Sequence, residues 1–204
     1  MGVHPVIDLS QLINEKVADI KIKKKLIESD RVKLKVKFSN GREKEIELKR
    51  FVNLIDLAFC VGMFSGDGTK SGGRGFPFEF TNSNPKRIRK MIRFLQNLGV
   101  KKDEIELRLQ IRCTKEEFES GLIKKLESFW SRFLSIPLQQ FEKPNVRISN
   151  KPRRSKFGTI RLRVNSNFLA KLFLELEKFM LAGLPQSPAT GRARVPPKGR
   201  SEEG

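Results

Sequence analysis

Apolar and polar residues alternate over several segments of this 204-residue chain, which is the pattern of strands that bury one face. In residues 31–38 (RVKLKVKF) every second residue is basic, and Asn40-Gly41 separates this run from another at 45–48, which predicts a β-hairpin. Further alternating runs predict the strands of a second sheet, and they cover residues 76–81, 103–113, 145–150 and 158–165.

A period near 3.6 residues predicts helices in the remaining segments. The first is expected over residues 9–27, with Asp8 as its N-terminal cap. Another is expected over 86–98, between Asn84-Pro85 and Gly99, which are start and stop signals. The other predicted helices cover residues 51–64, 115–133 and 167–181. The buried face of the 115–133 helix is expected to be Phe118, Leu122, Leu126, Phe129 and Trp130.

This order of elements predicts an α+β fold, with helices packed on one face of a largely antiparallel sheet. Residues 1–50 are expected to form an accessory unit of a helix and a hairpin, and residues 51–182 the main domain. Residues 183–204 are rich in Pro and Gly and lack periodicity, so a disordered tail is expected there.

The charge of the chain points to a polyanionic partner. Lys and Arg number 42 against 23 Asp and Glu, for a net charge of +19, and nucleic acid is the common partner of such proteins. A lysine-rich thermophile surface would explain the abundance of Lys but not the unbalanced sign. No run of 18 apolar residues and no signal-peptide core is visible, so we expect a cytoplasmic protein with no membrane partner.

The cysteine and histidine content limits the possible chemistry. Cys60 and Cys113 lie far apart in apolar patterns and are expected to be reduced core residues. His4 is the single histidine, which leaves little room for a histidine general base. An enzyme built from this chain would work with carboxylates, metal and lysine.

The outward positions of the predicted strands are rich in arginine, which suits the phosphates and base edges of a nucleic-acid groove. Solvent-facing sides of sheets are polar in any case, so a plain solvated face is the alternative. The basic turn KPRRSK at residues 151–156 would add contacts to the same surface. The outward residues expected on the strands are Arg108, Gln110, Arg112, Arg147, Arg161 and Arg163.

The end of the 51–64 helix is unusual. Gly62 and Gly66 leave a bare stripe against which another backbone can pack, and Asp67 places an acid at the negative end of the helix dipole. An ordinary helix-ending turn is the alternative, because Asp-Gly is common turn chemistry.

With these residues in view, CVGMFSGDG at 60–68 resembles the divergent motifs of the LAGLIDADG homing endonuclease family, in its single-motif, stand-alone archaeal and bacterial type. The resemblance covers about residues 51–181. The downstream pieces agree in order: GDGT, a strand ending in FTNSNP, a helix ending in LGV, then FWSRFLSIPLQQFEKP, GTIRLRVNS and a final helix.

The resemblance implies an antiparallel sheet with the motif helix at a homodimer interface, and site-specific cleavage of double-stranded DNA associated with intron mobility. Asp67 and the carbonyl of Gly66 would hold Mg²⁺ (or Mn²⁺) together with Asp67 of a partner chain. Gly62, Gly66 and Ser65 would lie at the interface, Ser65 where the consensus has an acid. Asn82 matches a water-positioning residue. A basic residue is expected near the scissile phosphate; Lys156 is one candidate, with Lys151, Arg153 and Arg154 as the others, and the sequence does not choose among them. Further DNA contacts are expected from Lys70, Arg74, Lys151, Arg153 and Arg154.

Two other functions remain open at this point. One is a LAGLIDADG-derived DNA- or RNA-binding protein without cleavage, such as a transcriptional regulator or a splicing maturase. The other is a basic protein associated with structured RNA or the ribosome, which would explain the charge but not Gly62 and Gly66.

Overall fold

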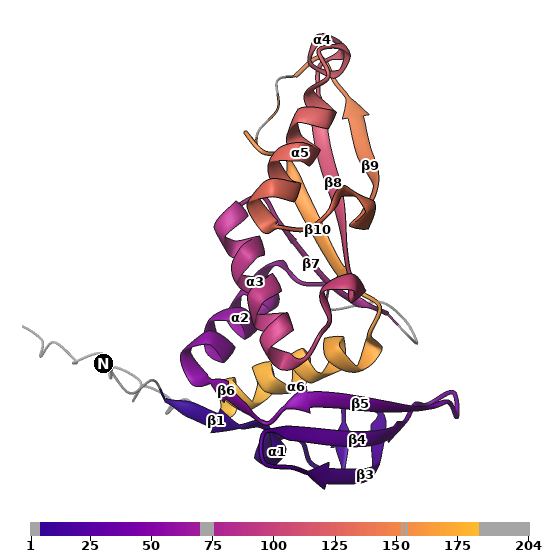
Figure 1. Ribbon diagram of the computed structural model, residues 1–204, viewed down its shortest axis with the longest axis vertical. Coiled ribbons are helices and arrows are strands. Elements are labelled where there is room, and N and C mark those ends of the chain that lie inside the picture. Colours follow the sequence, from indigo (N-terminus) through magenta and orange to yellow (C-terminus); the bar gives the residue numbers. More distant parts are fainter. Residues whose placement is uncertain (1–4, 70–75, 152, 154, 184–204) are drawn as a thin grey trace, which may run out of the picture.

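The protein has an α+β fold built around a four-stranded sheet, as the sequence predicts (Figure 1). The computed structural model describes residues 5–69, 76–151, 153 and 155–183. The strand order is β7-β10-β8-β9, and both neighbours of β10 run antiparallel to it. The strands are β7 (Phe78–Asn82), β8 (Ile105–Cys113), β9 (Phe141–Ile148) and β10 (Thr159–Val164).

The edge strand β9 departs from the antiparallel pattern, because it pairs in parallel with β8. Parallel neighbours need a crossover connection, and here the chain returns through α4 (Lys115–Glu119), α5 (Leu122–Leu134) and η2 (Leu138–Gln140). One continuous helix was expected over 115–133. Gly121 divides it, because its φ of +75° lies in the left-handed region.

Helices α2 (Leu54–Asp67), α3 (Pro85–Leu98) and α6 (Asn167–Gly183) complete the core. Phe64 of α2 stacks on Phe78 of β7 with ring centroids 4.8 Å apart, and Phe173 of α6 meets both rings edge-on. These rings are buried. The outward positions of the strands carry the polar side chains, so the helices cover only the apolar face.

Helix α3 follows the sequence signals closely. The Asn84 side chain accepts a hydrogen bond from the Lys86 amide (3.0 Å), Pro85 opens the helix, and Gly99 ends it with a φ of +110°. A short 3-10 turn, η1 (Lys102–Glu104), then leads into β8. In α5, Leu126 and Trp130 are buried as predicted, whereas Phe118 of α4 is exposed.

The expected helix over residues 9–27 was wrong. The structure has a single turn, α1 (Leu9–Leu12), followed by β2 (Lys16–Val17) and β3 (Ile20–Ile27). Ala18 takes a φ of +54° in the turn between these strands. The predicted cap at Asp8 is present, since its side chain accepts from the Ser10 amide (2.9 Å).

The predicted hairpin is confirmed as β4 (Arg31–Lys37) and β5 (Glu43–Lys49), with Gly41 at a φ of +84°. Strands β2-β3-β4-β5 form an antiparallel sheet in chain order. The predicted start of the 51–64 helix is replaced by a short strand, β6 (Phe51–Asn53), which pairs with β1 (Val6–Asp8).

The N-terminal sheet, residues 16–49, packs against the rest of the molecule in one hydrophobic core. Lys171 of α6 is buried and pairs with Asp19, and Gly99 lies so close to β5 that an added Cβ would stand 3.2 Å from the Glu47 carbonyl. Cys60 and Cys113 are buried free thiols, as expected, and burial raises the pKa of Cys60 to about 12.

Candidate nucleic-acid interface

The C-terminal end of α2 brings Asp67 together with Asn82 and Arg87. Asn82 Nδ2 donates to Asp67 Oδ2 (2.7 Å), and Asn82 Oδ1 accepts from the Asn84 amide (2.7 Å). A guanidinium nitrogen of Arg87 lies 3.7 Å from the same Asp67 oxygen. This cation on α3 offsets the repulsion between the carboxylate and the negative end of the helix dipole. The Asp67 side chain stays 38% exposed.

Backbone contacts hold this helix end against the edge strand β7. The Gly68 amide donates to the Phe64 carbonyl (2.8 Å), and Gly68 forms a bridge with Phe80. A Cβ added to Gly68 would stand 2.4 Å from the Phe64 ring, so glycine is required by the close approach. The position of Asp67 is therefore fixed by the core packing of Phe64.

One side of α2 is bare. A Cβ built on Gly62 or Gly66 would meet no atom within 4 Å, and both glycines are exposed. Towards the beginning of the helix, Ile55 and Phe59 are 57% and 50% exposed on the surface. The Ser65 hydroxyl, by contrast, donates to Glu177 on α6 of the same chain, so it is turned away from this bare side.

The predicted arginine-rich face of the central sheet exists, and the strand register arranges it in cross-strand rows. Thr81, Arg161, Arg108 and Glu142 form one row across all four strands. The neighbouring rows are Glu79-Arg163-Glu106 on one side, then Thr159-Gln110-Asn145 and Arg112-Arg147 on the other.

Two carboxylates neutralise much of this face. Glu142 pairs with Arg108 and, at 2.9 Å, with Arg161, and its other oxygen lies 3.7 Å from Arg163. Glu79 lies 3.7 Å from both Arg161 and Arg163. These three arginine side chains are only 20–34% exposed, and their Nε atoms are buried without a hydrogen-bond partner among the residues that the structure describes.

The sequence pattern does not place Glu142 on this face, because the strand was expected to begin only at residue 145. The parallel pairing of β8 with β9 sets Glu142 beside Arg108, and nothing in the sequence pattern indicates that pairing. Positive charge without a carboxylate in its own row remains at Arg112 and Arg147, which lie side by side at one end of the sheet.

The basic turn lies towards that same end. Ile160, near the start of β10, pairs with Asn82 of β7, and Asn82 is hydrogen-bonded to Asp67 at the end of α2. The turn before β10 and the end of α2 therefore lie at the same end of the sheet. Lys151 and Lys156 are exposed, whereas Arg153 is held by Glu117 (3.3 Å) and by the Lys156 carbonyl (2.9 Å). The predicted contacts Lys70, Arg74 and Arg154 lie outside the described residues.

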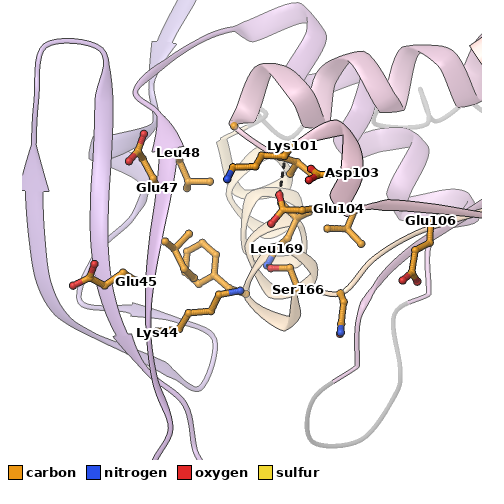
Figure 2. A pocket seen from close by; sticks show the side chains of 16 residues that line it. Lys44, Glu45, Glu47, Leu48, Lys101, Asp103, Glu104, Glu106, Ser166 and Leu169 are labelled. Atoms are coloured by element: carbon orange, nitrogen blue, oxygen red, sulfur yellow. Dashed lines mark hydrogen bonds between the residues drawn. The ribbon is translucent and has the colours of Figure 1, made fainter. Parts of the chain in front are cut away.

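A cleft lies at the surface between the N-terminal sheet and the central sheet. It has a volume of about 340 Å³ and lies where β5 meets η1 and the start of α6 (Figure 2). The Lys101 amide donates to Glu104 (2.8 Å) inside it. Its lining carries both signs of charge: Lys44 and Lys101 point into the space, and Asp103, Glu104 and Glu106 also line it. Glu45 and Glu47 point to the other side of β5 (Figure 2).

No group of three or more His, Cys, Asp or Glu side chains that could hold a metal ion occurs within residues 5–69, 76–151, 153 and 155–183. In the same part of the chain, no helix has both the length and the apolar character needed to cross a membrane. No family model, curated protein or solved structure matches the chain.

Proposed function

We propose that the protein is a homodimeric, metal-dependent endonuclease for double-stranded DNA, of the LAGLIDADG type. The observation that carries the proposal is α2: its bare glycine side leads to Asp67, whose carboxylate is held in place yet stays 38% exposed. Two copies of this helix packed along Gly62 and Gly66 would bring the two Asp67 side chains together at the end of the contact.

A metal site fits two chains better than one. Within the described part of the chain no group of three or more metal-ligating side chains occurs, but Mg²⁺ can be held by one or two carboxylates with water and phosphate as further ligands. Asp67 of both chains would hold the ion, with the Gly66 carbonyl, since carbonyls in the last turn of a helix have no intrahelical donor. The ion would supply water activation and stabilisation of the leaving oxygen.

The neighbours of Asp67 have roles of their own. The Asn82 hydrogen bond to Oδ2 fixes the orientation of the carboxylate, and the Asn84 amide in turn fixes Asn82. Arg87 stands 3.7 Å from Asp67 and is free to turn towards a DNA phosphate once a metal neutralises the carboxylate. Exposed lysines of the basic turn, Lys156 among them, lie towards the same end of the sheet.

The outward face of the central sheet would read the groove. Gln110 and Asn145 lie side by side there, and amide side chains can recognise adenine with paired hydrogen bonds. Arg112 and Arg147 have no carboxylate in their row and suit guanine or phosphate. Arg108, Arg161 and Arg163 would keep their ion pairs with Glu79 and Glu142, which hold the three guanidinium groups in place.

A second candidate function is DNA binding without cleavage, as a regulator, or RNA binding, as a splicing maturase. The specific observation in its favour is the ion pair of Asp67 with Arg87, a cation already beside the carboxylate that a metal would need.

The deciding experiment is cleavage of a randomised duplex library with Mg²⁺ or Mn²⁺ by wild type, Asp67→Asn and Asp103→Asn. Asp103 is an exposed acid on η1 and serves as the matched control. We expect cleavage at one long site by wild type and the control, and none by Asp67→Asn. Full cleavage by Asp67→Asn would refute the endonuclease. Tight binding without cleavage by any variant would establish the second candidate, and a parallel RNA-binding assay decides between its two forms.

A further inference from the structure

The N-terminal sheet carries a second basic surface, apart from the central sheet. Its outward face is formed by β2 to β5, at the lower end of the molecule in Figure 1. The register places Lys16 beside Lys21 and Lys21 beside Lys37, which makes a row of lysines across three strands. In the next row Lys24 lies beside Lys35. We call Lys16, Lys21, Lys24 and Lys37 the lysine rows.

The core fixes these lysines on the outside. Val32, Leu34 and Val36 of β4 are buried on the opposite face and alternate with the outward lysines. A slip of the register by one residue would bury the charges and expose the core, so the register is strongly determined.

Carboxylates balance only part of the outward face. The basic residues of β4 form ion pairs with glutamates: Lys35 with Glu43 (3.1 Å), Arg31 with Glu47, and Lys33 with Glu28 (2.7 Å). In the row of Lys16, Lys21 and Lys37, the last lysine, Lys37 of β4, stands opposite that same Glu43 of β5. Among the residues that the structure describes, no carboxylate lies within ion-pair distance of any member of the lysine rows.

Like charges placed directly opposite one another destabilise a sheet. The β4–β5 pair shows that this chain can set glutamate opposite lysine, as with Glu45 opposite Lys35 and Glu47 opposite Lys33. Between β3 and β4 it sets lysine opposite lysine instead. A local rule broken in this way, at a cost in stability, is typical of a functional surface.

We propose that the lysine rows bind the phosphate backbone of duplex DNA. Lysines opposite one another on neighbouring strands are separated by about 5 Å, so Lys16, Lys21 and Lys37 form a continuous line of positive charge, and Lys24 lies in the next row. A groove of about 520 Å³ lies on this sheet, and three lysines, Lys24, Lys33 and Lys35, line it together with the two carboxylates of Glu45 and Glu47. The inference rests on the proposed function only for the choice of DNA as the polyanion.

The composition of the face favours a duplex over single-stranded nucleic acid. Within the described strands β2 to β5 there is no aromatic residue, and proteins that bind single strands use aromatic platforms for stacking. Binding through phosphates alone is independent of sequence and strongly dependent on salt.

The test measures the salt dependence of binding to a non-specific DNA duplex, in EDTA, for wild type and for Lys21→Gln/Lys24→Gln/Lys37→Gln. Each phosphate contact contributes about 0.9 to the slope of log K against log salt, so the slope should fall by about 2.7. The matched control is Lys102→Gln/Lys124→Gln/Lys125→Gln, with the same change of charge at exposed positions on η1 and α5. Lys21→Gln alone should lower the slope by about 0.9.

An unchanged slope in the lysine-row variant, or an equal fall in the control, would overturn the proposal. So would displacement of wild type from the duplex by anionic vesicles or by RNA duplex at lower concentration than by unlabelled DNA. The thermal midpoint of the lysine-row variant should rise, because repulsion between lysines is relieved, and this readout also shows that the variant folds. Neither measurement involves Asp67 or metal, so failure of the endonuclease leaves this result standing.

Discussion

Substituting alanine for Gly62 and Gly66 should raise the stability of the monomer and weaken the dimer. In the single chain both positions face open space, with no atom within 4 Å of an added Cβ. Glycine in a helix is less stable than alanine by roughly 0.5–1 kcal/mol, because it loses more backbone entropy on folding. The double variant should therefore gain about 1–2 kcal/mol as a monomer.

For a chain of this size, 1 kcal/mol shifts the thermal midpoint by about 2–4 °C, so the expected rise is about 2–8 °C. The proposed dimer should respond in the opposite direction, because two methyl groups per chain would separate helices that are proposed to pack backbone to backbone. Sedimentation should show a weaker dimer, and DNA cleavage should fall with it.

The measurement is calorimetry at low protein concentration, where dimerisation adds little to stability, and sedimentation at several higher concentrations. Gly68→Ala is the control: its methyl group would collide with the Phe64 ring, so its midpoint should fall. A lower midpoint for the double variant would show that the glycines already pack against something in the monomer. A dimer of unchanged affinity would place the interface elsewhere.

Two further substitutions test the structure away from α2. Hydrogen bonds from Arg50 and Ser10 lower the pKa of Asp8 to about 2 from 3.8, so its contribution to stability is complete above pH 3.8 and is lost as the pH falls towards 2. The urea midpoint of wild type should fall across that window more steeply than that of Asp8→Asn; parallel curves would contradict the assignment. Trp130→Phe removes the Nε1 hydrogen bond to the Phe157 carbonyl (2.7 Å) and leaves that acceptor unpaired, which should cost about 1–3 kcal/mol in urea unfolding followed by circular dichroism. A loss below about 0.5 kcal/mol would mean that water replaces the indole.

Where local chemistry decides the structure, the sequence was a good guide. Asn84, Pro85 and Gly99 each act within one turn of α3, and the structure shows all of them as predicted. Asn40-Gly41 works in the same way, because a hairpin turn needs residues that accept positive φ. The helix over residues 9–27 failed because Ile13, Val17 and Ile20 recur at a helical spacing. The alternation of Ile20 and Ile22 fits a strand, and the pairing of β3 with β4 stabilises it.

In the candidate site, too, the features set by neighbouring residues could be predicted, and the contacts between elements could not. Gly62, Gly66 and Asp67 follow one another in the motif, so their placement on the end of one helix could be predicted. The contacts of Asp67 could not, because Arg87 reaches it from another helix. Nor could the pairing of the arginines with Glu142, since it depends on a parallel strand and a bulge after Arg108. Sequence alternation tells which side of a strand a residue faces, but not which residue lies across from it.

The two basic surfaces differ in the interactions that each would have to give up in order to bind DNA as proposed. Arg108, Arg161 and Arg163 already share Glu79 and Glu142, so a phosphate gains less there, while the network holds the guanidinium groups in a fixed arrangement. Lys21 and Lys24 give up only water and counterions, and repulsion between neighbouring lysines falls when a phosphate arrives. We therefore expect the lysine rows to supply most of the salt-dependent affinity and the central sheet most of the sequence preference. Removing the lysine rows should then weaken binding to all duplexes about equally, whereas Gln110→Ala should change which duplexes are preferred.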